Sequence, residues 1–538
     1  MGAPGYFWRM FVRKKKNKSG SITVQVISKA GRVFRSVRSF GVARTPAELH
    51  ALESAANRFI DDPGGATSEL FPEDRRTGFD RTFLGFMRSY TNTQLQVIGP
   101  ELIFGALYNR IGYDRIDNDM FRHLVISRLS SPGSKLKTVR YQKQYLNKDY
   151  SINSVYRFLD NLCYRGGRHA ERPDIKSQVG QITFEYTKRL SGGQVSIVFY
   201  DMTTLYFETS DEDDLRITGF SKDGKHTHPQ IYLGLLVTTG GNPIGYEIFE
   251  GNTFEGHTLI PVLEGMAERF GLGRPVVVAD AGLLSRSNLK ALQENGYEYI
   301  LGARPKNESR TIQDAILSRK LCDGDVVIIE RDAETRLVVS RTDSRTRKDA
   351  ANRLKGLRRL EKRLGSGRLT KASINNRGYN KYLRMDGKVT ISIDMEKFEA
   401  DGAWDGIKAY ITNTSLPGRE VIASYSQLWY IERAFRMNKT DLRIRPVYHR
   451  LRNRIEGHIC ICFTAYTVML ELERILKNST SRISLSRSCE LVQRIQQISF
   501  PLPDSREEVT VIFGLDEEQQ ELFNLVHPDK TLESFTED

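Results

Sequence analysis

Two short apolar segments that each run directly into an aspartate constrain the fold of this chain most. Val195–Tyr200 (VSIVFY) leads into Asp201, and Pro275–Ala279 (PVVVA) leads into Asp280. Continuous apolar runs of this length are typical of strands buried on both faces of a sheet. Ligands of α/β sheets bind at the carboxyl ends of strands, and a buried acid needs a partner such as a cation. The segments therefore predict an α/β sheet with two carboxylates at one edge, although a single such aspartate is also compatible with a plain turn or helix cap.

The segments around these two strands alternate between strand and helix patterns. Further strands are expected at Gln230–Thr238, Pro243–Phe249 and Tyr297–Leu301, and helices at Thr258–Phe270 and Ser285–Asn295. The resulting order is three strands, helix, strand, helix, strand. This order predicts a ribonuclease H-like mixed sheet flanked by helices.

The segment that follows this pattern interrupts it. Residues 305–417 contain strand-like pieces at Asp325–Ile329, Thr335–Ser340 and Val389–Ile393 around a very basic middle. We interpret them as a β-rich basic insertion, after which the core resumes.

The stretch Tyr425–Lys439 (YSQLWYIERAFRMNK) has the pattern of a helix with two different edges. It contains no Pro or Gly, and its apolar residues recur at helical spacing. The apolar stripe consists of Leu428, Ile431, Phe435 and Leu442. The stripe beside it consists of Tyr425, Glu432, Arg436 and Lys439. A solvated edge with ordinary helical charge pairs would give the same pattern, so the helix alone does not define a site.

Taken together, Asp201, Asp280 and Glu432 predict a carboxylate triad on one core. Mg²⁺ prefers oxygen ligands and is typically bound by a few carboxylates, with water and substrate phosphate completing its shell. Two such ions about 4 Å apart activate an attacking oxygen and stabilise a leaving one. The triad therefore predicts phosphoryl-transfer chemistry.

The charge balance favours a polyanionic partner. The 538 residues carry 80 Lys and Arg against 66 Asp and Glu, a net charge of +14. The excess is concentrated in residues 1–60, 345–384 and 433–454, which hold 12, 14 and eight basic residues against two, two and one acidic ones. Any single run is compatible with a solvated face, but three runs indicate nucleic acid.

Sequence composition also predicts how the chain is divided into domains and in which cellular compartment it is found. We expect a basic β-rich module at 1–75 with strands between 6 and 45, a helix Pro46–Asp61 and a linker Asp62–Gly65. The further parts expected are a helical DNA-end-binding region at 76–178, the first core part at 179–304, the insertion at 305–417, the closing core helices at 418–478 and a polar tail at 479–538. The five cysteines form no CxxC pair, the amino terminus has no signal core, and no apolar run spans a bilayer. These features predict a soluble, cytoplasmic protein with reduced thiols and no membrane partner.

Three blocks of the sequence resemble a known family. They are FYDMTTLYFE (199–208), VVVADAGLLSRSNL (276–289) and YSQLWYIERAFRMNK (425–439), supported by GFSKDGKHTHPQIYLGLLV (219–237) and GHTL (256–259). Over roughly residues 120–475 the chain resembles the DDE-type insertion-sequence transposases marked by Tyr-x2-Arg-x3-Glu-x6-Lys. Tyr425, Glu432 and Lys439 fall at the spacing of that signature, whereas Leu428 occupies its Arg position. Arg433 or Arg436 is expected to take over the missing DNA contact.

The resemblance implies a ribonuclease H-like core that cleaves DNA strands at the ends of a mobile element and joins them to target DNA. Asp201, Asp280 and Glu432 would be the ligands of Mg²⁺ or Mn²⁺, expected as two ions, while Tyr425 and Lys439 would hold phosphates. The implied partners are double-stranded DNA, as terminal inverted repeats and target, and a second copy of the chain on that DNA. The implied location is the bacterial cytoplasm, at the nucleoid when DNA is bound.

One further aromatic residue is considered because relatives in this family stack an aromatic of the insertion on a flipped base. Trp404 is the nearest tryptophan, and a core position in the insertion is favoured for it.

Two other functions remain open at this stage. One is a ribonuclease H-like nuclease that cuts without joining, and the other is a catalytically inactive DNA-binding derivative. The insertion and the basic modules favour the transposase over the nuclease, and the intact triad argues against the inactive derivative.

Overall fold

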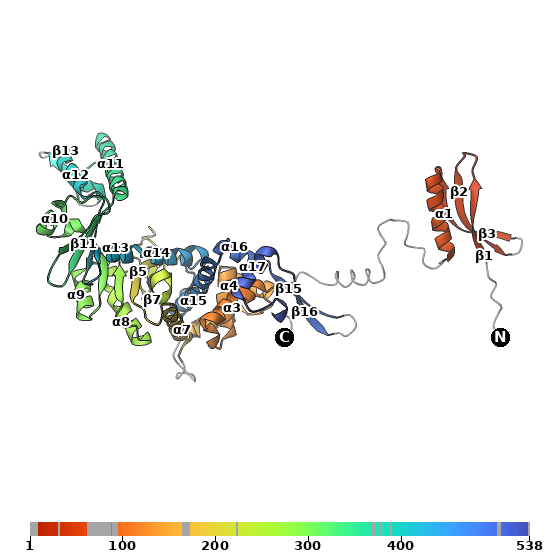
Figure 1. Cartoon of the computed structure of the whole chain (residues 1–538), viewed down its shortest axis with the longest axis horizontal. Helices are drawn as coiled ribbons and strands as arrows, with labels where there is room; N and C mark the ends of the chain where they lie inside the picture. Colours follow the sequence, from red (N-terminus) through yellow and green to blue (C-terminus); the bar gives the residue numbers. More distant parts are fainter. Residues whose placement is uncertain are drawn as a thin grey trace. The chain divides into compact units, whose positions relative to one another are not determined.

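In the computed structural model, the chain forms two compact units, residues 1–92 and 93–538 (Figure 1). The residues that the structure describes are 9–30, 33–61, 88, 95–163, 173–221, 224–367, 369–370, 373–375, 378–386, 390–502 and 507–535. The expected linker Asp62–Gly65 lies outside them.

In its described residues, the first unit is a small antiparallel sheet with a helix packed on it. The sheet has the order β1 (Arg9–Lys16), β2 (Ile22–Ala30), β3 (Val33–Ala43), and α1 (Pro46–Asp61) packs on it. Val24, Val26 and Ala56 form its buried centre. These are the strands and the helix expected from the alternating pattern and from the proline at the start of the helix.

The second unit begins with a short strand and a set of helices. These are β4 (Leu95–Val97), a π-helical turn (Glu101–Gly105), α3 (Ala106–Ile111), α4 (Asp119–Ser130), α5 (Lys135–Tyr145), α6 (Ile152–Leu162) and α7 (Ile175–Leu190). Ser151 caps α6, since its side chain accepts a hydrogen bond from the backbone N–H of Ser154 at 3.0 Å. The sequence predicted a helical region at 76–178, and α7 continues beyond that boundary to Leu190.

An eight-stranded mixed sheet forms the centre of the second unit. Its order is β10-β11-β14-β9-β8-β5-β6-β7, and β5 is parallel to β8, which is parallel to β9, while the other neighbours are antiparallel. The five strands expected from sequence are β5 (Ile197–Tyr206), β6 (Gln230–Val237), β7 (Pro243–Glu250), β8 (Val276–Ala279) and β9 (Tyr299–Ala303).

Helices cover both faces of this sheet. α8 (Leu259–Phe270) and α9 (Arg286–Glu294) pack on one face, around a core that includes Val198, Tyr200 and Val277. On the other face, α13 (Gly418–Ser426), α14 (Trp429–Arg436) and α15 (Arg452–Lys477) pack around a core that includes Phe199 and Val278. The two faces therefore alternate along β5 and β8, as the pleat of a strand requires.

The region between β9 and α13 contains more helix than expected. β10 (Val326–Glu330), β11 (Arg336–Arg341) and β14 (Ile407–Thr412) extend the central sheet, and β12 (Leu383–Asp386) pairs only with β13 (Thr390–Ile393). The very basic middle is the 23-residue helix α11 (Asp343–Gly365), accompanied by α10 (Arg310–Leu317) and α12 (Met395–Asp401). The prediction of a β-rich segment was therefore wrong for its basic part. A run without Pro whose Lys and Arg side chains are good helix formers explains the difference.

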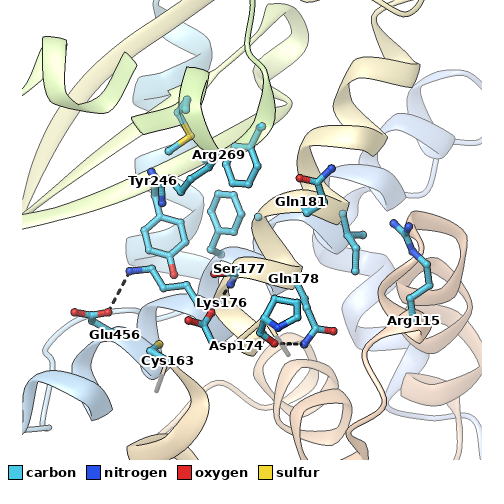
Figure 2. Close-up of a pocket in the computed structure, with 17 residues that line it drawn as sticks. Arg115, Cys163, Asp174, Lys176, Ser177, Gln178, Gln181, Tyr246, Arg269 and Glu456 are labelled. Carbon is cyan, nitrogen blue, oxygen red and sulfur yellow. Dashed lines mark hydrogen bonds and ion pairs between the residues drawn. The ribbon is translucent and has the colours of Figure 1, made fainter. Parts of the chain in front are cut away.

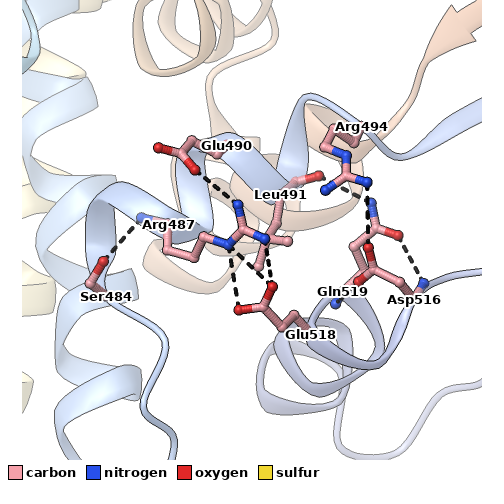
Figure 3. A network of polar contacts seen from close by, with 8 residues as sticks. All are labelled: Ser484, Arg487, Glu490, Leu491, Arg494, Asp516, Glu518 and Gln519. Carbon is pink, nitrogen blue, oxygen red and sulfur yellow. Dashed lines mark hydrogen bonds and ion pairs between the residues drawn. The ribbon is translucent and has the colours of Figure 1, made fainter.

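The carboxyl-terminal segment is folded, so the prediction of a polar tail at 479–538 was also wrong. It contains α16 (Leu485–Val492), β15 (Gln496–Pro501), β16 (Glu508–Ile512) and α17 (Glu517–Val526), and β15 pairs with both β16 and β4. Figure 3 shows the polar contacts around α16 and α17, in which Arg487 pairs with Glu490 of its own helix and with Glu518 of α17. Apolar residues of both helices, including Leu491 and Phe523, are fully buried beneath these contacts.

No helix in the described parts of the chain is long and apolar enough to cross a membrane. The five cysteines are free thiols, with Cys460 and Cys462 buried in α15.

Candidate active site

The register of the central sheet places Asp201 beside Asp280. Tyr200 of β5 is paired with Ala279, the last residue of β8, and the residue that follows each of them is an aspartate. Because Phe199 and Val278 face α13–α15, the alternation of side chains directs both aspartates to that same face. The sequence placed Asp201 at the end of its strand, and this detail was wrong. β5 continues to Tyr206, and Asp201 lies in its middle at the level where β8 ends.

Local hydrogen bonds hold both carboxylates. Oδ1 of Asp280 accepts a hydrogen bond from the backbone N–H of Gly282 at 2.7 Å, which forms the turn that ends β8. Oδ1 of Asp201 accepts one from the backbone N–H of Met202 at 2.7 Å. Asp280 is exposed and Asp201 is half-buried, so a ligand can reach this edge of the sheet.

The helix expected at Tyr425–Lys439 is divided into three parts. α13 ends at Ser426, α14 begins at Trp429, and a π-helical turn occupies Met437–Asp441. The expectation of one straight helix was therefore wrong, because the bonds at the junction tighten to the i→i−3 type, as from the N–H of Leu428 to the C=O of Tyr425 at 3.1 Å. The predicted apolar stripe is confirmed, since all four of its residues are buried.

Tyr425 links this helix pair to the two aspartates. Its ring packs against Tyr410, with 4.6 Å between the ring centroids, and its hydroxyl lies directly against Gly302 of β9. Burial and the carboxylates of Asp280, Glu432 and Asp201 raise the pKa of Tyr425 to about 12. All three predicted acids therefore act on one phenol, which stays protonated and can donate a hydrogen bond at neutral pH.

The three basic residues of the predicted site have different surroundings. Arg433 forms an ion pair with Glu473 of α15, so its guanidinium is directed to the helix packing. Arg436 is exposed on α14, and Lys439 is half-buried in the π-helical turn. Leu428, in the Arg position of the signature, is only 8% exposed and belongs to the core.

A fourth carboxylate close to Asp280 was missed. A methyl group added at Gly282 would lie 2.9 Å from Oδ1 of Asp280 and 3.4 Å from Oε2 of Glu255, so both acids flank this glycine. Burial raises the pKa of Tyr200, and the carboxylates of Asp201 and Glu255 raise it further. The only signal in the sequence was the position of Glu255 next to the GHTL block.

Comparison with known proteins adds the family. A family model described as the transposase DDE domain matches residues 193–468, just over half of the chain.

The chain belongs to the DDE transposase family.

Solved transposase structures resemble this transposase only distantly. One is the piggyBac transposase synaptic complex with hairpin DNA, at 9% identity over 74% of this chain and 78% of that chain, with a TM-score of 0.35. Another is the Mos1 transposase paired-end complex with left transposon end, at 13% identity over 47% of this chain and 74% of that chain, with a TM-score of 0.15. Among curated proteins the comparison found no match.

The oxygen atoms of the predicted carboxylates are of the donor type that a divalent cation prefers. Asp201 and Asp280 are neighbours, and oxygen is the ligand atom that Mg²⁺ and Mn²⁺ prefer. Within the described ranges, however, no three His, Cys, Asp or Glu side chains are grouped closely enough to hold an ion. In the described part of the chain, the position of Glu432 therefore does not complete a three-residue group with the two aspartates.

A groove of about 590 Å³ continues from Tyr425 towards the region that follows β9. Trp404 is one of its lining residues, is half-buried, and packs against the core of the central sheet, as expected for a core aromatic. The Lys306 ammonium lies 6.0 Å from the centroid of its ring. The groove therefore joins an aromatic and a cation to the edge that carries Asp280.

A larger cavity, of about 660 Å³, lies between α7, β7, α8 and α15 (Figure 2). Lys176 Nζ lies 3.1 Å from Glu456 Oε2, and Arg269 on the opposite wall pairs with Glu247. Burial raises the pKa of the Cys163 thiol, which keeps it protonated. These charges already neutralise one another. The cavity is therefore less suited to binding a charged substrate than the sheet edge that carries the two aspartates.

Proposed function

We propose that this protein is a DNA transposase that cleaves DNA at the ends of a mobile element and transfers the freed strand to target DNA. One observation carries the proposal: the register of β5 and β8 brings Asp201 and Asp280 to one edge of the sheet, and α14, which carries Glu432, packs on the same face. The match to the transposase DDE domain supports it, because that match spans all three acids.

We also propose that five strands of the central sheet form a ribonuclease H-like core. Their spatial order β7-β6-β5-β8-β9, with β5, β8 and β9 parallel, supports this assignment. The sheet is flanked by helices on both faces. β14, β11 and β10 then extend this core as part of the insertion.

In this proposal Asp201, Asp280 and Glu432 hold Mg²⁺ or Mn²⁺, expected as two ions. When bound, the metal would activate the attacking oxygen and stabilise the leaving oxygen of the DNA strand. Glu432 would be supplied from α14, and the hydrogen bond from the backbone N–H of Gly282 supports the orientation of Asp280.

The neutral side chains and cations around the acids would orient the DNA. Tyr425 donates a hydrogen bond to a phosphate oxygen, which its raised pKa permits. Lys439 and exposed Arg436 would contact neighbouring phosphates as cations. We assign Arg433 to helix packing instead, because its ion pair with Glu473 supports that role.

The partners proposed are double-stranded DNA and, on that DNA, a second copy of the chain. The assay uses a duplex made from the DNA that flanks the coding region, with Mg²⁺ and a labelled target. A strand cut at the end of an inverted repeat and then joined to the target is the expected product. Cut but unjoined strands would identify a nuclease, and binding without cutting would identify an inactive derivative.

Replacing Lys439 with Ala should weaken binding of element ends about 10-fold, the effect of losing one charged hydrogen bond. Cleavage at subsaturating DNA should fall with it. Arg433→Ala is the matched control on the same segment, and it should lower the melting temperature rather than the affinity. Wild-type affinity and turnover in a normally folded Lys439→Ala protein would remove Lys439 from the site.

DNA binding should depend steeply on salt, because each phosphate that a cation neutralises releases counterions. α11 exposes Arg358, Arg359 and Lys362, and we expect their joint replacement with Gln to flatten the plot of log affinity against log salt. The slope should fall by about one for each cation that contacts a phosphate. The control removes an equal charge elsewhere, at the exposed residues Lys188, Lys290 and Lys530. An equal loss of slope in both variants would contradict a DNA contact by α11.

A further inference from the structure

A cationic cavity of about 440 Å³ lies between the α4–α5 turn and the segment after the π-helical turn. Its basic lining residues include the four cations Arg128, Lys135, Arg443 and Arg445. The remaining lining residues are Gly133, Ser134, Leu136, Tyr156, Pro446, Tyr448, His449 and His458. None of these lining residues is acidic, so the lining of the cavity is positively charged.

Lys135 is the most unusual of these residues because its ionisable side chain is buried. It is the first residue of α5 and is 5% exposed. Within the described part of the chain, no acidic side chain contacts its ammonium. Burial and the nearby guanidinium of Arg128 lower the pKa of Lys135 to about 7. A buried cation in this situation is costly unless an anion accompanies it.

Arg128 adds a second buried cation whose partners are neutral. It is 4% exposed and donates long hydrogen bonds to the C=O of Leu442, at 3.4 Å, and to Nδ1 of His458, at 3.5 Å. Nε2 of His458 donates to the C=O of Ile444 at 3.0 Å. Burial and the neighbouring cations lower the pKa of His458 well below its usual value, so this imidazole is neutral and does not offset the charge.

The start of α5 adds to the same field. α5 has 11 residues and no acidic residue in its first turn, and Ser134 accepts a hydrogen bond from the N–H of Lys137 at 3.2 Å. The first N–H groups of a helix and its dipole favour an anion at this end. The helix end and the two buried side chains therefore favour the same kind of ligand.

The rim of the cavity is suited to a nucleic-acid strand. Arg443 is exposed, and Tyr448, which is 70% exposed, offers a flat aromatic face. The adjacent Val447 donates its N–H to the C=O of Tyr206 at 3.3 Å, which ties the rim to β5. Tyr206 lies five residues from Asp201 on that strand, or roughly 17 Å at the rise of an extended chain. One DNA strand bound at the active site can therefore extend as far as the cavity.

We propose that this cavity binds a phosphate group of the DNA backbone through Lys135 and Arg128. The presence of an anion site follows from the cavity alone, whereas its assignment to DNA rests on the proposed function. A free phosphate ion has the same chemistry, so the two sources must be separated by experiment.

The test compares the full-length wild type with Lys135→Met, which keeps the length of the side chain and removes its charge. Inorganic phosphate should raise the melting temperature of the wild type but not that of the variant. In phosphate-free buffer the variant should melt at a higher temperature than the wild type, because a lone buried charge is gone. Its affinity for duplex DNA, measured without metal, should fall roughly 10- to 100-fold, and its salt slope by about one.

Two controls keep the test decisive. Lys137→Met removes an exposed charge two residues further along α5 and should keep the phosphate response. Arg443→Gln changes an exposed residue of the rim, so it should fold normally and weaken DNA binding even if Lys135→Met does not fold.

Three outcomes would overturn the proposal in different ways. An equal phosphate response in wild type and Lys135→Met would exclude an anion site. A lost phosphate response with wild-type DNA affinity would assign the cavity to a free anion instead of DNA. A wild type that binds phosphate but no DNA would contradict the proposed function while leaving the anion site intact.

Discussion

Replacing Asp280 with Asn should abolish DNA strand cleavage, with a loss of at least about 10³-fold. Asn removes the negative charge that a divalent ion requires but keeps an oxygen that can accept the 2.7 Å hydrogen bond from Gly282. The turn after β8 should therefore persist, and the melting temperature should stay close to that of the wild type. Single-turnover cleavage at saturating DNA, followed beside a melting curve, measures both effects.

DNA affinity without metal gives a second readout for the same variant. It should be unchanged or slightly tighter, because the carboxylate repels phosphate until a cation is bound. The exposed Asp314 of α10 supplies the matched control, and Asp314→Asn should cleave normally. Wild-type cleavage by a folded Asp280→Asn protein would remove this acid from the catalytic centre.

Replacing Gly302 with Ala should reduce both stability and cleavage. The added methyl group would lie 2.5 Å from the hydroxyl of Tyr425 and 3.0 Å from the backbone nitrogen of Ala281, so the phenol must move. Overpacking of this kind typically costs about 1–3 kcal/mol. The displaced phenol would also leave the carboxylates on which its raised pKa depends, and we expect cleavage to fall about 10²-fold.

A double-mutant cycle separates the effect of this steric clash from a non-specific loss of stability. Tyr425→Phe removes the hydroxyl, so Gly302→Ala should cost less stability in that background than in the wild type. The relief should be partial, because the Ala281 contact remains. Strictly additive changes in stability would show that the hydroxyl of Tyr425 does not contact Gly302.

The sequence predicted those elements whose side chains follow a regular period. The apolar runs before Asp201 and Asp280 located β5 and β8, but Thr203 and Thr204 concealed the second half of β5, since both are polar and yet buried. α11 was missed for the opposite reason: few of its residues are buried, so it has almost no apolar stripe. Periodicity identifies half-buried elements best and fails for those that are nearly all buried or nearly all exposed.

Contacts between residues far apart in the sequence explain the remaining differences between the predicted and the observed structure. β15 pairs with β4 across about 400 residues, which no local pattern in the carboxyl-terminal segment indicates. Likewise, Glu255 becomes a neighbour of Asp280 only through the fold around Gly282. The three acids could be proposed from the sequence because Asp201 and Asp280 follow apolar runs and Glu432 lies within a helical pattern, whereas no such pattern marks the fourth acid or the cationic cavity.

Metal-directed cleavage of the protein backbone tests most directly whether Asp201, Asp280 and Glu432 share a metal. Fe²⁺ would replace Mg²⁺, and with ascorbate and peroxide it would generate radicals that cut the chain near the bound ion. We predict cuts around residues 201, 280 and 432 together, which disappear together in Asp280→Asn and persist in Asp314→Asn. Cuts confined to other segments, or a pattern that Asp280→Asn leaves unchanged, would contradict a shared site.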